Sequence, residues 1–189
     1  MRKFGVIFVN RFFRGKIMRA INYTIIIIAI IILAGACRKV EDISPVPSIE
    51  FVKFAIFDTF DILGNRSKGG RLDFTFEDGD GNVGLKPPVA NQPDTSNLFF
   101  NLFRKIDGKM VEAPANDPLT PSSYRVPYMV RLGQNKVLKG TISITFLYLF
   151  YTKTDTISYD FFLVDREMNS SNIETTAEII VSENKVYTK

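Results

Sequence analysis

Apolar and polar residues alternate along much of the chain after residue 47. Every second residue of Arg71–Glu77 is Leu or Phe, and the residues between them are charged or hydroxylic. The same period of two opens Thr141–Phe150 and runs through Thr156–Val164. Strict alternation over such lengths predicts strands with one buried face. Further strand candidates, rich in β-branched or aromatic residues, are Ser48–Phe57, Asn97–Ile106, Tyr124–Leu132 and Ile173–Val181.

Turn-forming residues fall between these segments. Asp, Gly, Asn and Ser gather at residues 78–81, 107–108, 133–135 and 168–171, where they favour tight changes of chain direction. No window has the 3.6-residue period of an amphipathic helix. Seven or so short strands in about 140 residues predict an all-β fold, a single antiparallel β-sandwich over residues 48–189.

The N-terminal 36 residues follow a different pattern. They contain six basic residues, no acidic residue, and a run of nine apolar residues at Ile25–Leu33. A basic start, a short apolar run and small residues before a cleavage point are typical of a secretory signal peptide. The length argues against a membrane span, because Ile25–Ala36 would make roughly 18 Å of helix against a hydrocarbon core of about 30 Å. Met18 opens a compact leader of ordinary length, so translation starts either there or at Met1.

The end of the leader carries a candidate lipidation motif. Leu33-Ala34-Gly35-Ala36-Cys37 resembles the lipobox of bacterial lipoproteins. The resemblance implies cleavage between Ala36 and Cys37 and acyl chains attached to Cys37, the one cysteine of the chain. Two or three acyl chains anchor a protein stably, since each buried methylene contributes about 0.8 kcal/mol. Residues 37–47, which carry two prolines, are then expected to form an extended lipidated tether. The alternative is ordinary signal cleavage, with Cys37 an incidental thiol.

Removing the leader changes the charge. The whole chain has 24 basic and 20 acidic residues, and loss of the six basic leader residues leaves 18 against 20, a net charge of −2. The basic character therefore belongs to the leader and gives no reason to expect a nucleic-acid partner. The remaining 153 residues suffice for one domain with a core, which the 17 phenylalanines are suited to fill.

Several segments resemble known bacterial proteins. Phe161–Ser171 is similar to the last hairpin of immunoglobulin-like and fibronectin III-like domains, in which a hydrophobic strand ends in Asp and the chain returns through a turn with Asn and Ser. Phe74–Leu85, Tyr124–Tyr128 and Gly133–Gly140 resemble segments of small, uncharacterised lipoproteins of Bacteroidota. The resemblance implies an immunoglobulin-like sandwich of about seven strands. It also implies an anchor in the outer membrane, on either the periplasmic or the extracellular face, but no particular activity.

One turn carries candidate metal ligands. Asp78, Asp80 and Asn82 stand at alternate positions, as the oxygen ligands of calcium loops do. The sixth and twelfth positions of the loop hold valine, where an EF-hand has Gly and Glu. Calcium would therefore need oxygens from elsewhere, such as Glu77, Asp165 or backbone carbonyls. The alternative is a hairpin turn in which Gly and Asn adopt positive φ.

Two further patterns each have two interpretations. Asp155-Thr156-Ile157 resembles the O-glycosylation sequence of Bacteroidota, with Thr156 as acceptor, but an Asp that opens a strand gives the same pattern. Some apolar residues also fall on strand faces that should contact water. They mark either an exposed partner site or a face covered by another segment. These residues are Leu147, Leu149, Tyr151, Phe162 and Val164.

Catalysis finds little support in the composition. The chain has no histidine, so it has no histidine base and no Ser-His-Asp triad. The sequence predicts a lipid-anchored, non-catalytic envelope or cell-surface protein with a binding or structural role, and it does not identify the partner, which is an envelope protein or a glycan. The alternative is a glycan-binding accessory module of a nutrient-capture system. That role would call for several exposed aromatic rings in one plane, such as Tyr124, Tyr128 and Tyr151, because the chain has no tryptophan.

Overall fold

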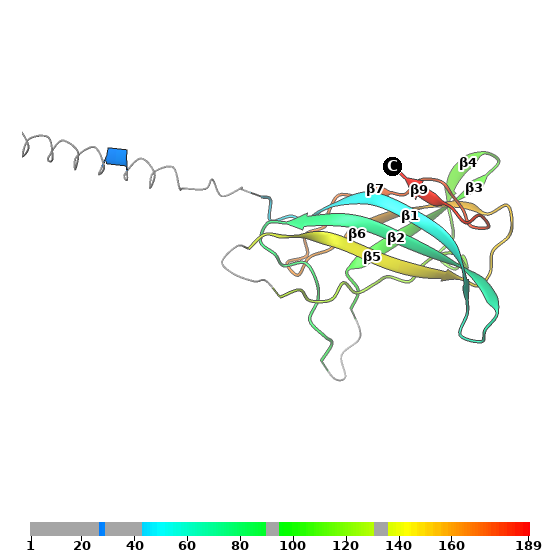
Figure 1. The fold of residues 1–189 in the computed structure, drawn as a ribbon, viewed down its shortest axis with the longest axis horizontal. Helices are drawn as coiled ribbons and strands as arrows, with labels where there is room; N and C mark the ends of the chain where they lie inside the picture. The colour runs from blue at the N-terminus through cyan, green and yellow to red at the C-terminus, as the bar shows by residue number, and fades with distance from the viewer. Residues whose placement is uncertain (1–26, 29–42, 90–94, 131–135) are drawn as a thin grey trace, which may run out of the picture. The chain divides into compact units, whose positions relative to one another are not determined.

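The computed structural model describes residues 27–28, 43–89, 95–130 and 136–189. The chain separates into two units, Met1–Glu41 and Asp42–Lys189, and the strands found among the described residues belong to the second unit (Figure 1). Cys37 and Ala36 lie outside the described residues. The strands are β1 (Ser48–Phe60), β2 (Arg66–Asp78), β3 (Leu98–Ile106), β4 (Lys109–Glu112), β5 (Leu138–Tyr148), β6 (Thr156–Leu163), β7 (Glu174–Thr175), β8 (Ile179–Ile180) and β9 (Val186–Thr188).

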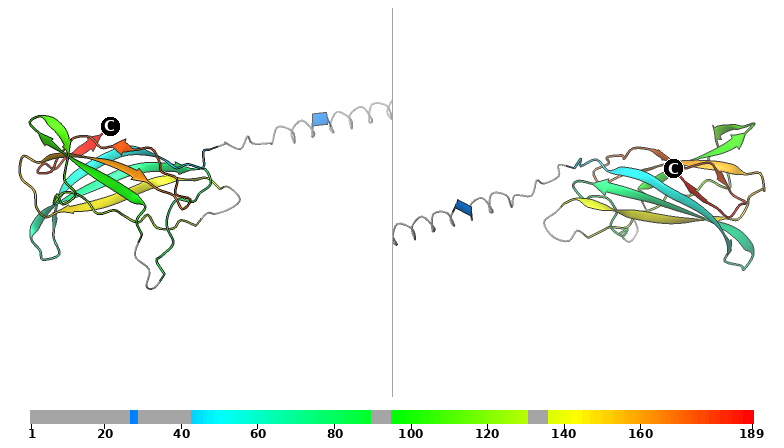
Figure 2. Two further views of the ribbon diagram at one scale, coloured as in Figure 1. Left: turned by 180° about the vertical axis from the view of Figure 1, so that it is seen from behind. Right: turned by 45° about the horizontal axis from the view of Figure 1, so that its top comes forward.

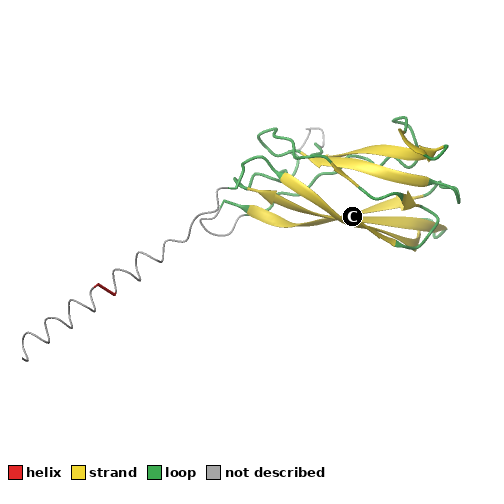
Figure 3. Cartoon of the chain, turned by 90° about the horizontal axis from the view of Figure 1, so that it is seen from above, coloured by secondary structure: helices red, strands yellow, loops and turns green. Residues whose placement is uncertain are grey.

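The strands form two antiparallel sheets. The first has the order β5-β2-β1-β9, and the second has the order β4-β3-β6-β7, with β8 also paired to β6. The two sheets lie in separate layers (Figure 3), and the view from behind brings β3 and β4 in front of the first sheet (Figure 2). This arrangement confirms the predicted all-β fold and is consistent with a β-sandwich.

The core between the layers is largely aromatic. Phe54 and Phe74 of the first sheet are fully buried, as are Tyr159 and Phe161 of the second. The Phe74 and Phe161 ring centroids are 5.2 Å apart, and those of Phe54 and Tyr159 are 6.0 Å apart. Contacts at these spacings join the two sheets directly. The alternation in Arg71–Glu77 therefore describes a real buried face.

Most predicted strands are confirmed, with shifted ends. The structure extends the predicted Ser48–Phe57 to Phe60 and begins the strand predicted at Arg71 five residues earlier, at Arg66. The predicted Ile173–Val181 contains two separate short pairings, β7 and β8. Between them the Thr176 side chain, rather than a backbone group, accepts a hydrogen bond from the Tyr159 N–H at 3.0 Å.

The prediction of a strand at Tyr124–Leu132 is wrong for its described residues. They make isolated bridges only, one between Tyr124 and Leu98 and one between Pro127 and Leu85. Pro127 has no N–H to donate to a ladder, and the Val126 N–H donates to the Asn97 side chain at 2.7 Å instead of to a neighbouring strand. The sequence analysis also missed β4 and β9, which are four and three residues long and too short to show a period.

The predicted turn at residues 107–108 is confirmed. Asp107 and Gly108 have φ values of 49° and 77° and join β3 to β4. Two consecutive positive φ values are those of the type I′ turn that suits the twist of a two-stranded hairpin. In the second predicted hairpin, Phe161–Ser171, the chain leaves β6, makes a bridge between Val164 and Ser170, and returns to β7. The predicted turn at 133–135 lies outside the described residues.

Candidate functional site

The segment that leads into β1 packs against the loop that follows β2. The Gly79 N–H donates to the Ser44 carbonyl at 2.9 Å. A Cβ atom added to Gly79 would lie 2.2 Å from the Ile43 carbonyl oxygen, so only glycine permits this approach. Pro47 is buried. The last residues of the predicted tether, Ile43–Pro47, are therefore packed on the loop that holds the candidate calcium ligands. Among the described residues, no helix has the length and apolar character needed to cross a membrane.

That loop is not a hairpin turn. β2 ends at Asp78, its two neighbours are β1 and β5, and the next strand, β3, belongs to the other sheet. The chain therefore leaves the first sheet at Asp78 and enters the second at Leu98. Gly81 has the expected positive φ of 65°, but Asn82 does not adopt one.

Asp78 is completely buried at the start of this crossover. Its Oδ2 accepts hydrogen bonds from the Asn82 N–H at 2.7 Å and the Val83 N–H at 2.9 Å. Its Oδ1 is buried as well and has no hydrogen-bond partner. Burial raises the pKa of the Asp78 carboxyl, the two backbone N–H groups lower it, and the nearby Asp80 carboxylate raises it again. One oxygen of this carboxyl group is therefore held in place by the backbone while the other is unsatisfied.

Asn82 links the two acidic residues of the loop. Its side-chain N–H donates to Asp80 Oδ2 at 2.9 Å, and its backbone N–H also contacts Asp80 Oδ1 at 3.2 Å. This arrangement fixes the orientation of the amide, so its oxygen is Asn82 Oδ1, which is buried and has no hydrogen-bond partner. The structure thus holds Asp78, Asp80 and Asn82 in one turn, as the sequence spacing predicts, and leaves two of their oxygens unsatisfied.

The predicted additional ligands are engaged elsewhere. Glu77 pairs with Lys139 at 2.8 Å. Asp165 accepts N–H bonds from Glu167 and from the backbone and side chain of Asn169, each at 2.8 Å, and so caps its own turn. Within the described part of the chain, no three His, Cys, Asp or Glu side chains are grouped in a way that could hold a metal ion.

Arg166 closes the other side of the same loop. Its Nη1 donates to the Gly84 carbonyl at 2.8 Å, and its guanidinium carbon lies 5.0 Å from the centroid of the Tyr128 ring. Arg166 therefore ties residues 81–84 to the turn after β6 and to the segment that contains Tyr128.

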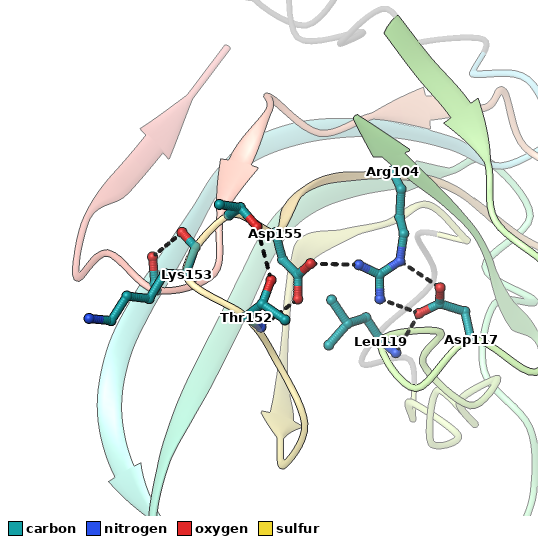
Figure 4. Close-up of polar contacts among 8 residues, drawn as sticks. Arg104, Asp117, Leu119, Thr152, Lys153 and Asp155 are labelled. Atoms are coloured by element: carbon teal, nitrogen blue, oxygen red, sulfur yellow. Dashed lines mark hydrogen bonds and ion pairs between the residues drawn. The ribbon is translucent and has the colours of Figure 1, made fainter. Parts of the chain in front are cut away.

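A second charged cluster supports the opposite end of β6 (Figure 4). Arg104 lies between Asp117 and Asp155, with Nη2–Oδ1 and Nη1–Oδ1 distances of 2.8 Å and 2.9 Å. Asp117 also accepts the Leu119 N–H at 2.9 Å. The hydrogen bond from Arg104 is the main reason that the pKa of Asp117 is lowered. Charge-assisted hydrogen bonds of this kind are among the stronger ones in proteins. The Arg104 guanidinium, paired with both carboxylates, is therefore suited to holding the segment around residue 117 on the sheet. The sequence analysis missed it because its members are far apart in the chain.

The candidate glycosylation residue and the three candidate platform tyrosines lie in different parts of the domain. Thr156 is the first residue of β6, partly exposed and paired with Ile180 of β8. Tyr124 packs at the rim of the core, 5.9 Å from the Phe100 ring and 5.8 Å from the Phe146 ring. Tyr128 lies near Arg166, and Tyr151 follows β5. Tyr124 is thus part of the core packing rather than an exposed ring.

A shallow polar groove of about 660 Å³ lies over the first sheet, near the start of β1. Glu77 and Lys139 pair on its wall, and Glu174 pairs with Lys189 at 3.3 Å. The groove is therefore lined by charged and hydroxylic side chains. None of its lining residues has an exposed aromatic ring.

Large apolar side chains are exposed at the far end of the first sheet. Phe60 pairs with Arg66 where β1 turns into β2, and β5 ends beside them, since Tyr148 pairs with Lys68. Ile62 is 98 % exposed. We call the exposed side chains at this edge the apolar end; they are Phe60, Ile62, Leu63, Leu149 and Phe150.

The apolar residues predicted on wet strand faces divide into two groups. Leu147 and Leu149 are about half exposed, and Tyr151 is partly exposed. Phe162, in contrast, stacks on Phe99 at a centroid distance of 5.3 Å and is only partly accessible, as is Val164. The first group adjoins the apolar end, whereas the second is partly covered by neighbouring side chains.

Comparisons of the chain with protein-family models, with curated proteins and with solved structures find no significant match.

Proposed function

We propose that this chain is a lipid-anchored, non-catalytic protein of the outer membrane that holds a β-sandwich away from the bilayer and binds an envelope protein through its apolar end. The anchor is supported by the basic leader, the short apolar run and the lipobox-like Leu33–Cys37. The non-catalytic role is supported by the absence of histidine from the sequence. The position of the domain on the periplasmic or the extracellular face is left to experiment.

The order of the strands supports an immunoglobulin-like sandwich. Immunoglobulin domains pair their first, second and fifth strands in one sheet and their third and sixth in the other. Here β1, β2 and β5 are neighbours in the first sheet, and β3, β6 and β7 are neighbours in the second. β8 and β9 are additions at the edges.

The observation that carries the binding role is the gathering of aliphatic and aromatic side chains at the apolar end. β1 begins at Ser48, beside the tether, and ends at Phe60. Thirteen residues at roughly 3.3 Å each separate these points by about 40 Å. An apolar surface at that distance from the attached end is positioned to meet another molecule, and exposed apolar groups of this kind mark interaction sites.

The aliphatic composition favours a protein partner over a glycan. Three of the five side chains at the apolar end, Ile62, Leu63 and Leu149, offer no flat ring for a sugar to stack on, and none of the five carries a polar group to bind sugar hydroxyls. The polar groove near the start of β1 supplies polar groups but no exposed ring. The glycan-binding accessory module stays the alternative prediction.

The anchor is tested by labelling cells with radioactive palmitate. Wild-type chain is expected to take up label and a Cys37→Ala variant is not. Protease treatment of intact cells then distinguishes the two faces of the membrane, since only an extracellular domain is cleaved. Label that persists in the variant would contradict the lipid anchor.

The binding role is tested by placing a photo-crosslinking residue at Ile62 in the apolar end, in living cells. Val111 of β4 is the matched control, because it is 46 % exposed but belongs to the second sheet. A discrete protein adduct at position 62 that is absent at 111, and that disappears when Leu63 is changed to Asp, supports the proposal. Equal labelling at both positions, or labelling of lipid alone, refutes it.

A further inference from the structure

We propose that the Asp78–Asn82 loop binds a divalent cation of the calcium type, with ligands from the side chains of Asp78, Asp80 and Asn82. The loop lies where the tether meets the sandwich, so the cation would also strengthen that junction. The inference rests on the polar atoms that the fold leaves unsatisfied.

The first argument is the state of the two buried oxygens. Asp78 Oδ1 and Asn82 Oδ1 are inaccessible to solvent and accept no hydrogen bond. Asp78 is completely buried, and Asn82 is 7 % exposed. A buried acceptor without a donor destabilises the folded state, and native proteins rarely leave one unexplained. Two such oxygens in one five-residue loop call for a positive species that the protein itself does not supply.

The second argument is the chemistry of the three candidate ligands, Asp78, Asp80 and Asn82. Carboxylate and amide oxygens are the ligands that calcium prefers, and it accepts six to eight of them in irregular geometry. Asp78 and Asp80 lie in one loop and Asn82 donates to both carboxylates, its backbone N–H to Asp78 Oδ2 and its side-chain N–H to Asp80 Oδ2, so two like charges are held close together. A divalent cation would turn that repulsion into attraction.

The small number of side-chain ligands also limits the affinity for calcium. Three side chains leave several coordination positions to water, and Arg166 places a positive charge on the Gly84 carbonyl at 2.8 Å, at the edge of the same loop. A site with two carboxylates and a nearby guanidinium belongs with the weak extracellular calcium modules, whose Kd is about 0.1–1 mM. Magnesium demands stricter geometry and sheds its water reluctantly, so it is expected to bind less well.

The position of the loop gives the cation a structural consequence. The Gly79 N–H, between the two acidic residues, donates to the Ser44 carbonyl at 2.9 Å. Ordering Asp78 and Asp80 would hold Gly79 more firmly against Ile43 and Ser44. Cation binding is therefore expected to slow hydrogen exchange of the peptide that contains Gly79.

The test uses the full-length chain in detergent, with calcium chloride or with a chelator. At 10 mM calcium and a Kd of about 0.1–1 mM, the melting temperature is expected to rise by about 3–10 °C. Calorimetric titration should give a Kd in the same range. No shift and no binding heat at 10 mM calcium would overturn the proposal.

Two variants assign the effect to the loop. Asp80→Asn is expected to raise the calcium Kd at least tenfold, whereas Asp107→Asn, in the exposed Asp-Gly turn between β3 and β4, should leave it unchanged. Asn82→Asp adds a third carboxylate, so it is expected to lower the melting temperature in chelator and to lower the calcium Kd about tenfold. A calcium response that Asp80→Asn and Asn82→Asp leave unaltered would place the ion elsewhere and refute the proposal.

Discussion

Two buried tyrosines provide a sharp test of the core. Tyr159 Oη donates to the Leu119 carbonyl at 2.9 Å, and the hydroxyl groups of Tyr148 and Tyr159 are 3.1 Å apart. A carbonyl only accepts and a hydroxyl has one proton, so the Tyr159 proton goes to Leu119 and Tyr148 must donate to Tyr159. Tyr159 is 0 % exposed, Leu119 2 % and Tyr148 3 %, so water does not replace a lost partner.

This direction of the hydrogen bonds predicts that two similar substitutions lower the free energy of unfolding by different amounts. Tyr159→Phe leaves the Leu119 carbonyl without a donor and the Tyr148 hydroxyl without an acceptor. Each unsatisfied buried group costs about 1–3 kcal/mol, so for two groups we expect a loss of about 2–6 kcal/mol. Tyr148→Phe removes one donor but leaves the bond to Leu119, so we expect a loss of about 0.5–1.5 kcal/mol.

Urea unfolding of both variants, followed by circular dichroism, measures the difference. We expect unchanged m values and a lower midpoint for Tyr159→Phe than for Tyr148→Phe. The double variant should cost no more than about 1 kcal/mol beyond Tyr159→Phe, because the hydroxyl of Tyr148 has already lost its acceptor. Equal losses for the two single variants, or a larger loss for Tyr148→Phe, would refute the hydrogen-bond assignment.

Two more predictions concern the charged cluster and the tether. The pKa of Asp117 is lowered in the folded state, chiefly by Arg104. Its contribution to stability is therefore present above its unfolded pKa and lost as pH falls through the lowered folded value. Acid titration should thus destabilise wild type more than Asp117→Asn below about pH 4, and parallel curves would contradict this. Gly79→Ala places a Cβ 2.2 Å from a tether carbonyl and should speed proteolysis within residues 43–47. Gly108→Ala is also strained, by its φ of 77°, but it lies in the β3–β4 turn with nothing within 4 Å of its added Cβ, so it controls for a general loss of stability and should not speed this cleavage. Equal cleavage would contradict the packing of residues 43–47 on Gly79.

Local pattern was enough to predict most of the strands and one of the turns. Alternation in Arg71–Glu77 and Thr156–Val164 predicted the buried faces of β2 and β6, because a strand next to a core must turn every second side chain toward it. Asp107-Gly108 predicted its hairpin, because few residues adopt consecutive positive φ values. The residues of the candidate cation loop were also predicted together, since they are neighbours in the chain.

Other features depended on partners distant in the sequence. Tyr124–Leu132 has strand-like residues, but Asn97, in another segment, takes the hydrogen bond that a ladder would use. Leu147 and Phe162 look alike on their strands, yet only Phe162 has a ring, that of Phe99, packed on it. Nothing in the neighbouring residues indicates which face another segment will cover.

The sequence by itself determined the all-β class, most strand positions and the spacing of Asp78, Asp80 and Asn82, because these depend on interactions between near neighbours. Only the tertiary structure decided that Asp78 is completely buried with one unsatisfied oxygen, and that the apolar end is exposed. Both depend on which segments pack against a residue. Burial removes the water that would otherwise satisfy a carboxylate, and it is a property of the assembled sheets rather than of any one segment.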